Sequence, residues 1–188
     1  MAISVSNGKV DLIVMRPRDY VRGLQDLVNE HLTGKSNLIG VEIGSFQGES
    51  ADIFLESNAF DKLYCIDAWA NGYDATDAAS YQADLAEAAF DKRFAHDERI
   101  IKIKGYSFDV CNQIPDNIDF LYIDGNHQPE AVMQDLQLYA CKVKQGGIIA
   151  GHDYEPTHYA GLMAVVDSYF GHKPEHTYID KSWVNIKH

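Results

Sequence analysis

The chain has 188 residues, a length that suits one domain, and we expect a single domain over residues 1–188. Hydrophobic residues make up 46% of the chain and charged residues 23%, which argues against a disordered chain. Asp and Glu together number 28 against 16 Lys and Arg, and the net charge of -12 argues against a nucleic-acid partner.

The sequence also indicates where the protein works. No segment resembles a signal peptide, and no apolar run approaches the roughly 18 residues that span a membrane. We therefore expect a cytoplasmic protein without membrane association. The cysteines Cys65, Cys111 and Cys141 are odd in number and widely spaced, so we expect reduced thiols, with Cys65 and Cys141 buried, and no cysteine-based zinc site.

The first half of the chain alternates helical and strand patterns. Tyr20, Leu24, Leu27 and Val28 recur at helical spacing, and Gly34 ends that pattern. The two apolar runs that follow are too short for helices and are typical of buried strands. The elements expected are an N-terminal helix over about 18–33, a strand over 38–43, a glycine-bearing turn over 44–48, a helix over 49–57 and a strand over 62–67.

The second half continues the alternation. In the later part of the Ala/Asp-rich segment 71–96, Tyr81, Leu85, Ala88 and Ala89 share one helical face, which predicts a helix. The elements expected after it are strands over 100–103 and 118–124, a helix beginning at Pro129, a turn at 146–147, a strand over 148–152, a helix over 162–170, and two strands over 176–179 and 183–186.

Strands that alternate with helices predict an α/β fold with a doubly wound, mostly parallel sheet. The last two strands are joined by a short polar connection at 180–182 and predict a closing antiparallel hairpin. In such sheets ligands bind beyond the carboxyl ends of the strands. The residues that directly follow each predicted strand are therefore the candidate site.

The segment V-E-I-G-S-F-Q-G-E-S, residues 41–50, is the strongest local signal. Glycines at 44 and 48 let the backbone turn sharply and approach a ligand, and the N–H groups of the following helix favour a carboxylate or phosphate. A tight strand-to-helix turn without a ligand would have the same pattern. The spacing differs from the dinucleotide-binding G-x-G-x-x-G, which disfavours NAD.

Two further strand ends carry candidate binding residues. Asp67 ends the second strand about twenty residues after the turn, where a carboxylate can accept ribose hydroxyls or simply face solvent. Trp69 follows, and its ring either flanks a ligand or packs in the core. Tyr106 and Ser107 follow the third strand, where they either contact an adenine edge or form an ordinary turn.

Acids and histidines gather after the fourth and fifth strands. Asp124 and His127 follow the fourth strand, and His152 and Asp153 follow the fifth. Because these strands are neighbours in a doubly wound sheet, we expect the four side chains to lie in one region. Two carboxylates and two imidazoles there either bind a divalent metal or perform general acid–base chemistry. A single histidine at such a place is often only structural.

Four motifs in this order carry a family resemblance: E-I-G-S-F-Q-G-E-S, L-Y-C-I-D-A-W, I-D-F-L-Y-I-D-G-N-H and G-G-I-I-A-G-H-D-Y. Together they resemble class I S-adenosylmethionine-dependent methyltransferases, and more narrowly the branch of the macrocin-type sugar O-methyltransferases. The resemblance runs from about Leu38 to Phe170. It implies the Rossmann-like methyltransferase fold, a seven-stranded sheet whose last two strands form the terminal hairpin.

The resemblance also implies a cofactor site. The turn would wrap the methionine end of S-adenosylmethionine, Asp67 would take the ribose, Tyr106 and Ser107 would lie by the adenine, and Asp124 would face the methyl-donor centre. The expected cofactor-binding residues are Glu42, Gly44, Ser45, Phe46, Gly48, Ser50, Asp67, Trp69, Tyr106, Ser107 and Asp124.

Metal-dependent members of the family hold magnesium with acids after the fourth and fifth strands. The matching positions are Asp124, His152 and Asp153. The chain departs from the family pattern at His152, because the members carry a second acid there. Magnesium prefers oxygen ligands, so the imidazole leaves manganese, another transition metal or no metal as alternatives to magnesium.

The activity expected is methyl transfer to a hydroxyl of a small molecule or sugar, with His127 as general base, assisted by Asp124. Metal activation of the hydroxyl is the second choice. Three alternatives remain at this point: a methyltransferase-like domain that binds without turnover, an NAD-dependent oxidoreductase, and a metal-dependent hydrolase. A homodimer is expected only from the habits of the class.

Overall fold

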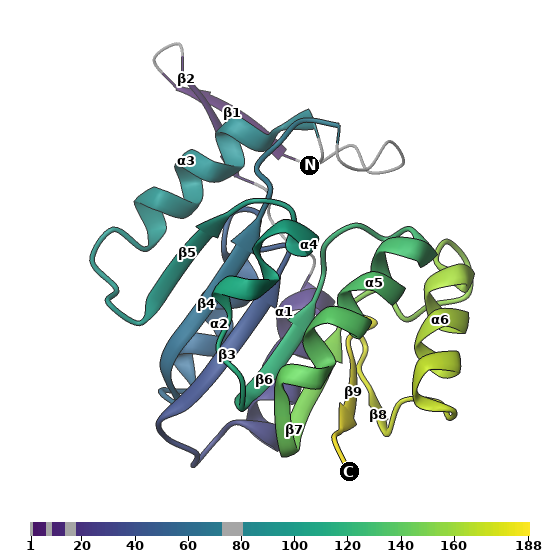
Figure 1. Cartoon of the computed structure of the whole chain (residues 1–188). Coiled ribbons are helices and arrows are strands. Elements are labelled where there is room, and N and C mark those ends of the chain that lie inside the picture. Colours follow the sequence, from purple (N-terminus) through teal and green to yellow (C-terminus); the bar gives the residue numbers. More distant parts are fainter. Residues whose placement is uncertain (1, 7–8, 14–17, 73–80) are drawn as a thin grey trace.

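A computed structural model describes residues 2–6, 9–13, 18–72 and 81–188. Its main element is a seven-stranded sheet of order β5-β4-β3-β6-β7-β9-β8 (Figure 1). Strands β3 to β7 are parallel, and β9 lies antiparallel between β7 and β8. The strands are β3 (Leu38–Ile43), β4 (Phe60–Asp67), β5 (Ile100–Lys104), β6 (Ile118–Ile123), β7 (Val143–Gly151), β8 (His176–Thr177) and β9 (Trp183–Ile186).

Helices cover both faces of this sheet. Figure 1 shows α4 and α5 in front of it and α1 and α2 behind it. The helices are α1 (Arg18–His31), α2 (Glu49–Glu56), α3 (Ala83–Arg93), α4 (Ser107–Val110), α5 (Pro129–Tyr139) and α6 (Ala160–Phe170), with the short 3-10 turns η2 (Cys111–Gln113) and η3 (Ala140–Lys142). The predicted α/β fold with seven strands and a terminal hairpin is confirmed, although β8 is shorter than expected.

Two apolar cores explain this layering. Alternate residues of β6 point to opposite faces, as the pleat of a strand requires. Phe120 and Tyr122 join a core with residues of α1, α2 and α3, whereas Leu121 and Ile123 join a core with residues of α5 and α6. The largest buried side chain of the second core is Trp183 of β9. The terminal hairpin is therefore part of the packed sheet.

The helix predicted within 71–96 is present as α3, and the face that it buries is not the one that Tyr81 and Leu85 share. Residues 73–80 lie outside the described part of the chain, and α3 begins only at Ala83. It buries Ala83, Ala86 and Phe90, while Tyr81 and Leu85 are 61% and 47% exposed. Phe90 decides the orientation, because its ring packs against those of Trp69 and Phe94.

Three further details differ from the sequence-based expectations. Cys141 is exposed rather than buried, because it lies in η3 beyond the end of α5; all three thiols are free. The expected turn at 146–147 is a bulge within β7, where Gly146 has a φ of 74°. A separate antiparallel pair, β1 (Ala2–Ser6) and β2 (Lys9–Ile13), had no counterpart among the predicted elements.

The exit of β3 brings two backbone segments unusually close. Gly44 follows β3 with a φ of 89°, a conformation that non-glycine residues rarely adopt. A Cβ atom on Gly44 would lie 2.0 Å from the backbone oxygen of Asp124, which follows the neighbouring strand β6. Glycine at this position therefore lets the ends of β3 and β6 meet.

We predict that Gly44→Ala lowers the free energy of unfolding by about 3 kcal/mol, because it adds overpacking to backbone strain. Gly34→Ala is the matched control: Gly34 has a φ of 80° but nothing within 4 Å of a Cβ. It should cost only about 1 kcal/mol of strain. Urea unfolding measures both variants, and equal losses would contradict the proposed close approach.

Candidate functional site

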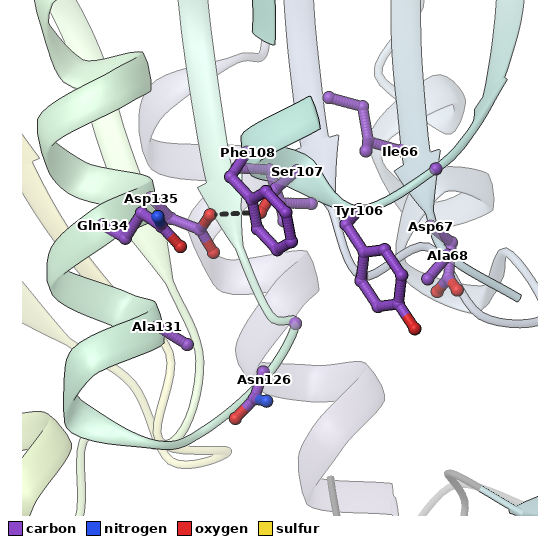
Figure 2. Close-up of a pocket in the computed structure, with 14 residues that line it drawn as sticks. Ile66, Asp67, Ala68, Tyr106, Ser107, Phe108, Asn126, Ala131, Gln134 and Asp135 are labelled. Atoms are coloured by element: carbon purple, nitrogen blue, oxygen red, sulfur yellow. Dashed lines mark hydrogen bonds between the residues drawn. The ribbon is translucent and has the colours of Figure 1, made fainter. Parts of the chain in front are cut away.

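A cavity lies beyond the carboxyl ends of β3, β4, β5 and β6 (Figure 2). The space between its walls is about 600 Å³, a figure that includes the open solvent at its mouth. It therefore occupies the place where ligands bind in doubly wound sheets. The residues that line it are Ile43, Gly44, Ile66, Asp67, Ala68, Gly105, Tyr106, Ser107, Phe108, Gly125, Asn126, Ala131, Gln134 and Asp135.

Asp67 ties the glycine turn to the end of β4. Its carboxylate accepts the backbone N–H of Phe46 at 2.9 Å through Oδ2 and that of Trp69 at 2.7 Å through Oδ1. Burial raises the pKa of Asp67, and the two backbone hydrogen bonds partly offset this rise. The turn and the acid, 21 residues apart in sequence, are thus in direct contact.

Several residues expected at the cofactor lie beneath the turn rather than on the cavity wall. Glu42 is fully buried and accepts a 2.5 Å hydrogen bond from the hydroxyl of Ser50. Ser45 is buried beside it. Burial raises the pKa of Glu42 to about 7, despite the hydrogen bonds from Ser45 and Ser50 that lower it. These side chains support the turn from below.

The ring of Trp69 packs in the core, which was one of the two alternatives for this residue. Its indole nitrogen donates to the carbonyl of Phe46 at 2.9 Å, and its ring lies 5.1 Å from that of Phe90. The Lys102 ammonium lies 4.7 Å from the ring centroid on the other side. Trp69 therefore holds the glycine turn through Phe46. Gly48 closes the same turn, with Phe94 where its Cβ would be.

The far wall of the cavity includes residues that sequence reasoning missed. Ser107 donates to the carboxylate of Asp135 at 2.5 Å, and Tyr139 donates to the carbonyl of Ser107 at 2.6 Å. Burial raises the pKa of Asp135 to about 6, although the Ser107 hydrogen bond lowers it. The sequence did contain a signal for Asp135, because this acid interrupts the apolar face of α5 between Val132 and Tyr139.

The predicted acid–histidine cluster does come together, next to the cavity. His127 Nε2 lies 3.0 Å from Asp153 Oδ2, and His152 Nδ1 lies 3.1 Å from Asp153 Oδ1. Both imidazoles lie 4.0 Å from Asp124 Oδ1. All four side chains are only 12% to 15% exposed. Asp153 is therefore the centre of the cluster, with one imidazole on each carboxylate oxygen.

The charges of this cluster are strongly coupled. Burial lowers the pKa of His152, but the carboxylates of Asp124 and Asp153 outweigh it and raise the pKa to about 9. Burial acts to raise the pKa of Asp153, but the hydrogen bonds from His127 and His152 bring it below its usual range. At neutral pH His152 is thus a cation between carboxylates, and Asp180 lies 3.9 Å from its other nitrogen.

The expected metal ligands are close enough to share an ion. Asp124, His152 and Asp153 each offer one ligand atom, and these atoms lie within 4.8 Å of one another. The donor set of two carboxylates and one imidazole fits a first-row transition ion better than magnesium. Glu30, His31 and His176 form a second such group, which sequence reasoning missed because the residues come from distant parts of the chain.

Comparison with protein families decides the class. A model of the family described as methyltransferase domain matches residues 41–154, more than half of the chain. The chain belongs to this methyltransferase-domain family. The match covers the exits of β3, β4, β5, β6 and β7, and so every strand end that borders the cavity and the cluster.

Individual proteins are similar to this chain in sequence or in fold. The uncharacterized protein R132 of Acanthamoeba polyphaga mimivirus is 32% identical over 126 residues, 64% of this chain, and the chain spans about half, 53%, of that relative's length. The O-methyltransferase NovP has a similar fold, with a TM-score of 0.60 at 18% identity over 89% of this chain and 77% of NovP. Protein SMU.1697c of Streptococcus mutans, solved with SAH (S-adenosylhomocysteine), has a TM-score of 0.59 at 12% identity over 83% of each chain.

The part of this methyltransferase-domain chain that the structure describes contains no helix both long and apolar enough to cross a bilayer. Of the expected cofactor residues, Gly44, Asp67, Tyr106 and Ser107 lie on the cavity wall.

Burial of the Glu42 carboxyl makes the stability of the fold depend on pH. Between pH 4.5 and 7 the folded protein keeps the Glu42 proton that the unfolded chain loses, so stability falls as pH rises through this window. A pKa raised to about 7 corresponds to a cost of about 3 kcal/mol at pH 8. We predict that Glu42→Gln removes this cost, because the amide oxygen still accepts from Ser50.

Urea unfolding at pH 4.5 and pH 8 tests this prediction. The variant should match the wild type near pH 4.5 and be more stable by about 3 kcal/mol at pH 8. Glu56→Gln, which changes an exposed carboxylate at the end of α2, serves as the control and should change neither value. Equal effects of Glu42→Gln at both pH values would contradict the assignment.

Proposed function

We propose that this chain is an S-adenosylmethionine-dependent methyltransferase that methylates a hydroxyl oxygen of a small molecule. One observation carries the proposal: the Asp67 carboxylate, which lines the cavity, holds the glycine turn directly. The family match supports methyl transfer over an NAD-dependent oxidoreductase and over a hydrolase. The neighbour solved with SAH supports the donor.

The residues of the cavity fit such a donor. Gly44 lines the cavity and carries no side chain, so a ligand's polar chain can approach its backbone closely. Asp67 accepts one N–H per oxygen and keeps lone pairs for ribose hydroxyls. Tyr106 and Phe108 add aromatic surface at the other strand end. When bound, S-adenosylmethionine supplies a methyl group on a positively charged sulfur.

The acid–histidine cluster supplies the base. A hydroxyl is a poor nucleophile until its proton is leaving, and His127 can take that proton at Nδ1, the ring nitrogen that does not face Asp153. Asp153, 3.0 Å from Nε2, accepts the hydrogen bond from that nitrogen, orients the ring and stabilises the imidazolium that forms. The imidazolium of His152 compensates the charge of Asp124 and Asp153, which lowers the free-energy cost of burying these two carboxylates.

Asp124, His152 and Asp153 are also the residues that would hold a divalent ion such as manganese. An ion there would act as a Lewis acid that lowers the pKa of the acceptor hydroxyl. The positive charge of His152 already lies beside the carboxylates that would bind such an ion. We therefore favour His127, rather than a metal ion, as the group that activates the hydroxyl. A hydroxyl acceptor fits the likeness to NovP, an O-methyltransferase. The net charge of -12 supports a small molecule rather than a nucleic acid.

We predict that S-adenosylhomocysteine raises the melting temperature of the wild type and that NAD does not. At a hundred times its dissociation constant a ligand adds about 2.7 kcal/mol of stability. Asp67→Ala should weaken S-adenosylhomocysteine binding at least about tenfold, measured by calorimetry, because the ribose loses a charged acceptor. Asp67→Asn, which retains one acceptor oxygen, should be intermediate. Unaltered affinity in Asp67→Ala would refute the ribose role.

We predict that His127→Ala slows methyl transfer by about two to four orders of magnitude, the usual contribution of a general base. Its affinity for S-adenosylhomocysteine should be unchanged. A panel of hydroxylated acceptors with labelled S-adenosylmethionine identifies a substrate and then measures the rate. His172→Ala, which changes an exposed histidine beyond the end of α6, should retain the wild-type rate. Full activity in His127→Ala would assign the base to another group.

A further inference from the structure

A second cluster of metal-ligating side chains lies where the end of α1 meets the edge strand β8. Glu30 and His31 are the last two residues of α1, and His176 is the first residue of β8. Each of the three offers one ligand atom, and these atoms lie within 4.8 Å of one another. None of the three lines the cavity or contacts Asp153 in the acid–histidine cluster. The proposed methyl transfer therefore gives them no role.

The carboxylate of Glu30 lies near both imidazoles. Its Oε2 is 3.8 Å from His31 Nε2 and 3.9 Å from His176 Nδ1. Ligand atoms placed tetrahedrally around zinc, each about 2.1 Å from the ion, are about 3.4 Å apart. The side chains of Glu30 and His176 are about half exposed, so small rotations can bring the three ligand atoms to that spacing.

The two imidazoles are suited to binding a metal ion at neutral pH. Their ring centroids are 5.0 Å apart with planes 73° apart, so two imidazolium charges would repel each other there. Burial lowers the pKa of His31, and the neighbouring His176 and Lys35 lower it further. The carboxylates of Glu30 and Glu175 counteract this only in part. His31 is therefore neutral at pH 7.5, the form in which an imidazole binds metal ions.

Tyr178 supports the carboxylate of this cluster from behind. Its hydroxyl donates to Glu30 Oε2 at 2.8 Å and lies 2.9 Å from His31 Nε2. A hydroxyl has one proton, so the imidazole donates to the tyrosine oxygen. An ion bound at Nε2 would replace that hydrogen bond, and the ring proton would move to Nδ1. Tyr178 would still hold the carboxylate of Glu30, as the hydrogen-bond partners of metal ligands commonly do.

We propose that Glu30, His31 and His176 bind a divalent transition-metal ion of the zinc type, which joins α1 to the edge strand β8. Imidazole and carboxylate together suit such an ion, whereas magnesium and calcium prefer oxygen ligands alone. Three protein ligands leave a fourth, tetrahedral position for water. A link at this place adds to a short pairing, because β8 has only two residues, which pair with Val184 and Trp183 of β9. The inference does not depend on the proposed function.

Zinc chloride, titrated into the full chain at pH 7.5 after treatment with a chelator, tests the inference. Calorimetry measures the affinity, and thermal unfolding measures the effect on stability. We expect zinc to bind the wild type and to raise its melting temperature, because the ion binds the folded state. His176→Ala and Glu30→Gln each remove one ligand and should weaken zinc binding at least about tenfold. Glu30→Gln keeps an acceptor oxygen for Tyr178, which preserves the local contacts.

Two further variants control for binding elsewhere. His172→Ala changes an exposed histidine in the same connection between α6 and β8, and should bind zinc like the wild type. Asp153→Asn alters the acid–histidine cluster and should retain the zinc binding that His176→Ala loses. Zinc binding that disappears in Asp153→Asn but is unchanged in His176→Ala would place the ion in the other cluster and overturn the inference. A wild type that binds no zinc would also overturn it, while leaving the proposed function intact.

Discussion

The hydrogen bonds that Asp67 accepts from Phe46 and Trp69 hold the rest of the site in place. Both donors have positive φ values, 44° and 39°, which bulky residues adopt only when the surroundings impose them. The indole of Trp69 then donates to the carbonyl of Phe46, and the carbonyl of Ile66 accepts the N–H of Gly44. The exits of β3 and β4 are thus one strained, cross-linked unit, preorganised before any ligand arrives.

The two halves of the site are held together by different kinds of interaction. The half at the cavity, where we propose that the donor binds (the donor half), is built mainly from backbone turns and one carboxylate, so its shape follows from the close approach of β3, β4 and β6. The adjacent half is built from ionised side chains around Asp153, itself at a φ of 62°. Its geometry depends on charge balance between two imidazoles and two carboxylates. A change that removes one charge there alters the pKa of the others, whereas the donor half responds mainly to packing.

Sequence patterns predicted the features that depend on local chain order. The five parallel strands, the glycine turn and Asp67 each follow from short motifs, and the neighbouring positions of β6 and β7 brought the His127 and Asp153 cluster together. Features set by packing were missed or misjudged. The buried face of α3 depends on the contact between the rings of Phe90 and Trp69. The hydrogen bond of Asp135 joins it to Ser107, 28 residues away in the sequence. No local pattern contains such long-range contacts.

Under the proposed function, different segments would fix the donor and select the acceptor. The ring of Tyr159, at the start of α6, lies 4.9 Å from that of His127, so the segment that leads from Asp153 into α6 borders the proposed base. The lining of the cavity where we propose that the donor binds includes none of this segment. An acceptor that loses its proton to His127 would contact Tyr159 or its neighbours. Acceptor specificity would then reside in the connection between β7 and α6, which can vary without disturbing the strained unit at Asp67.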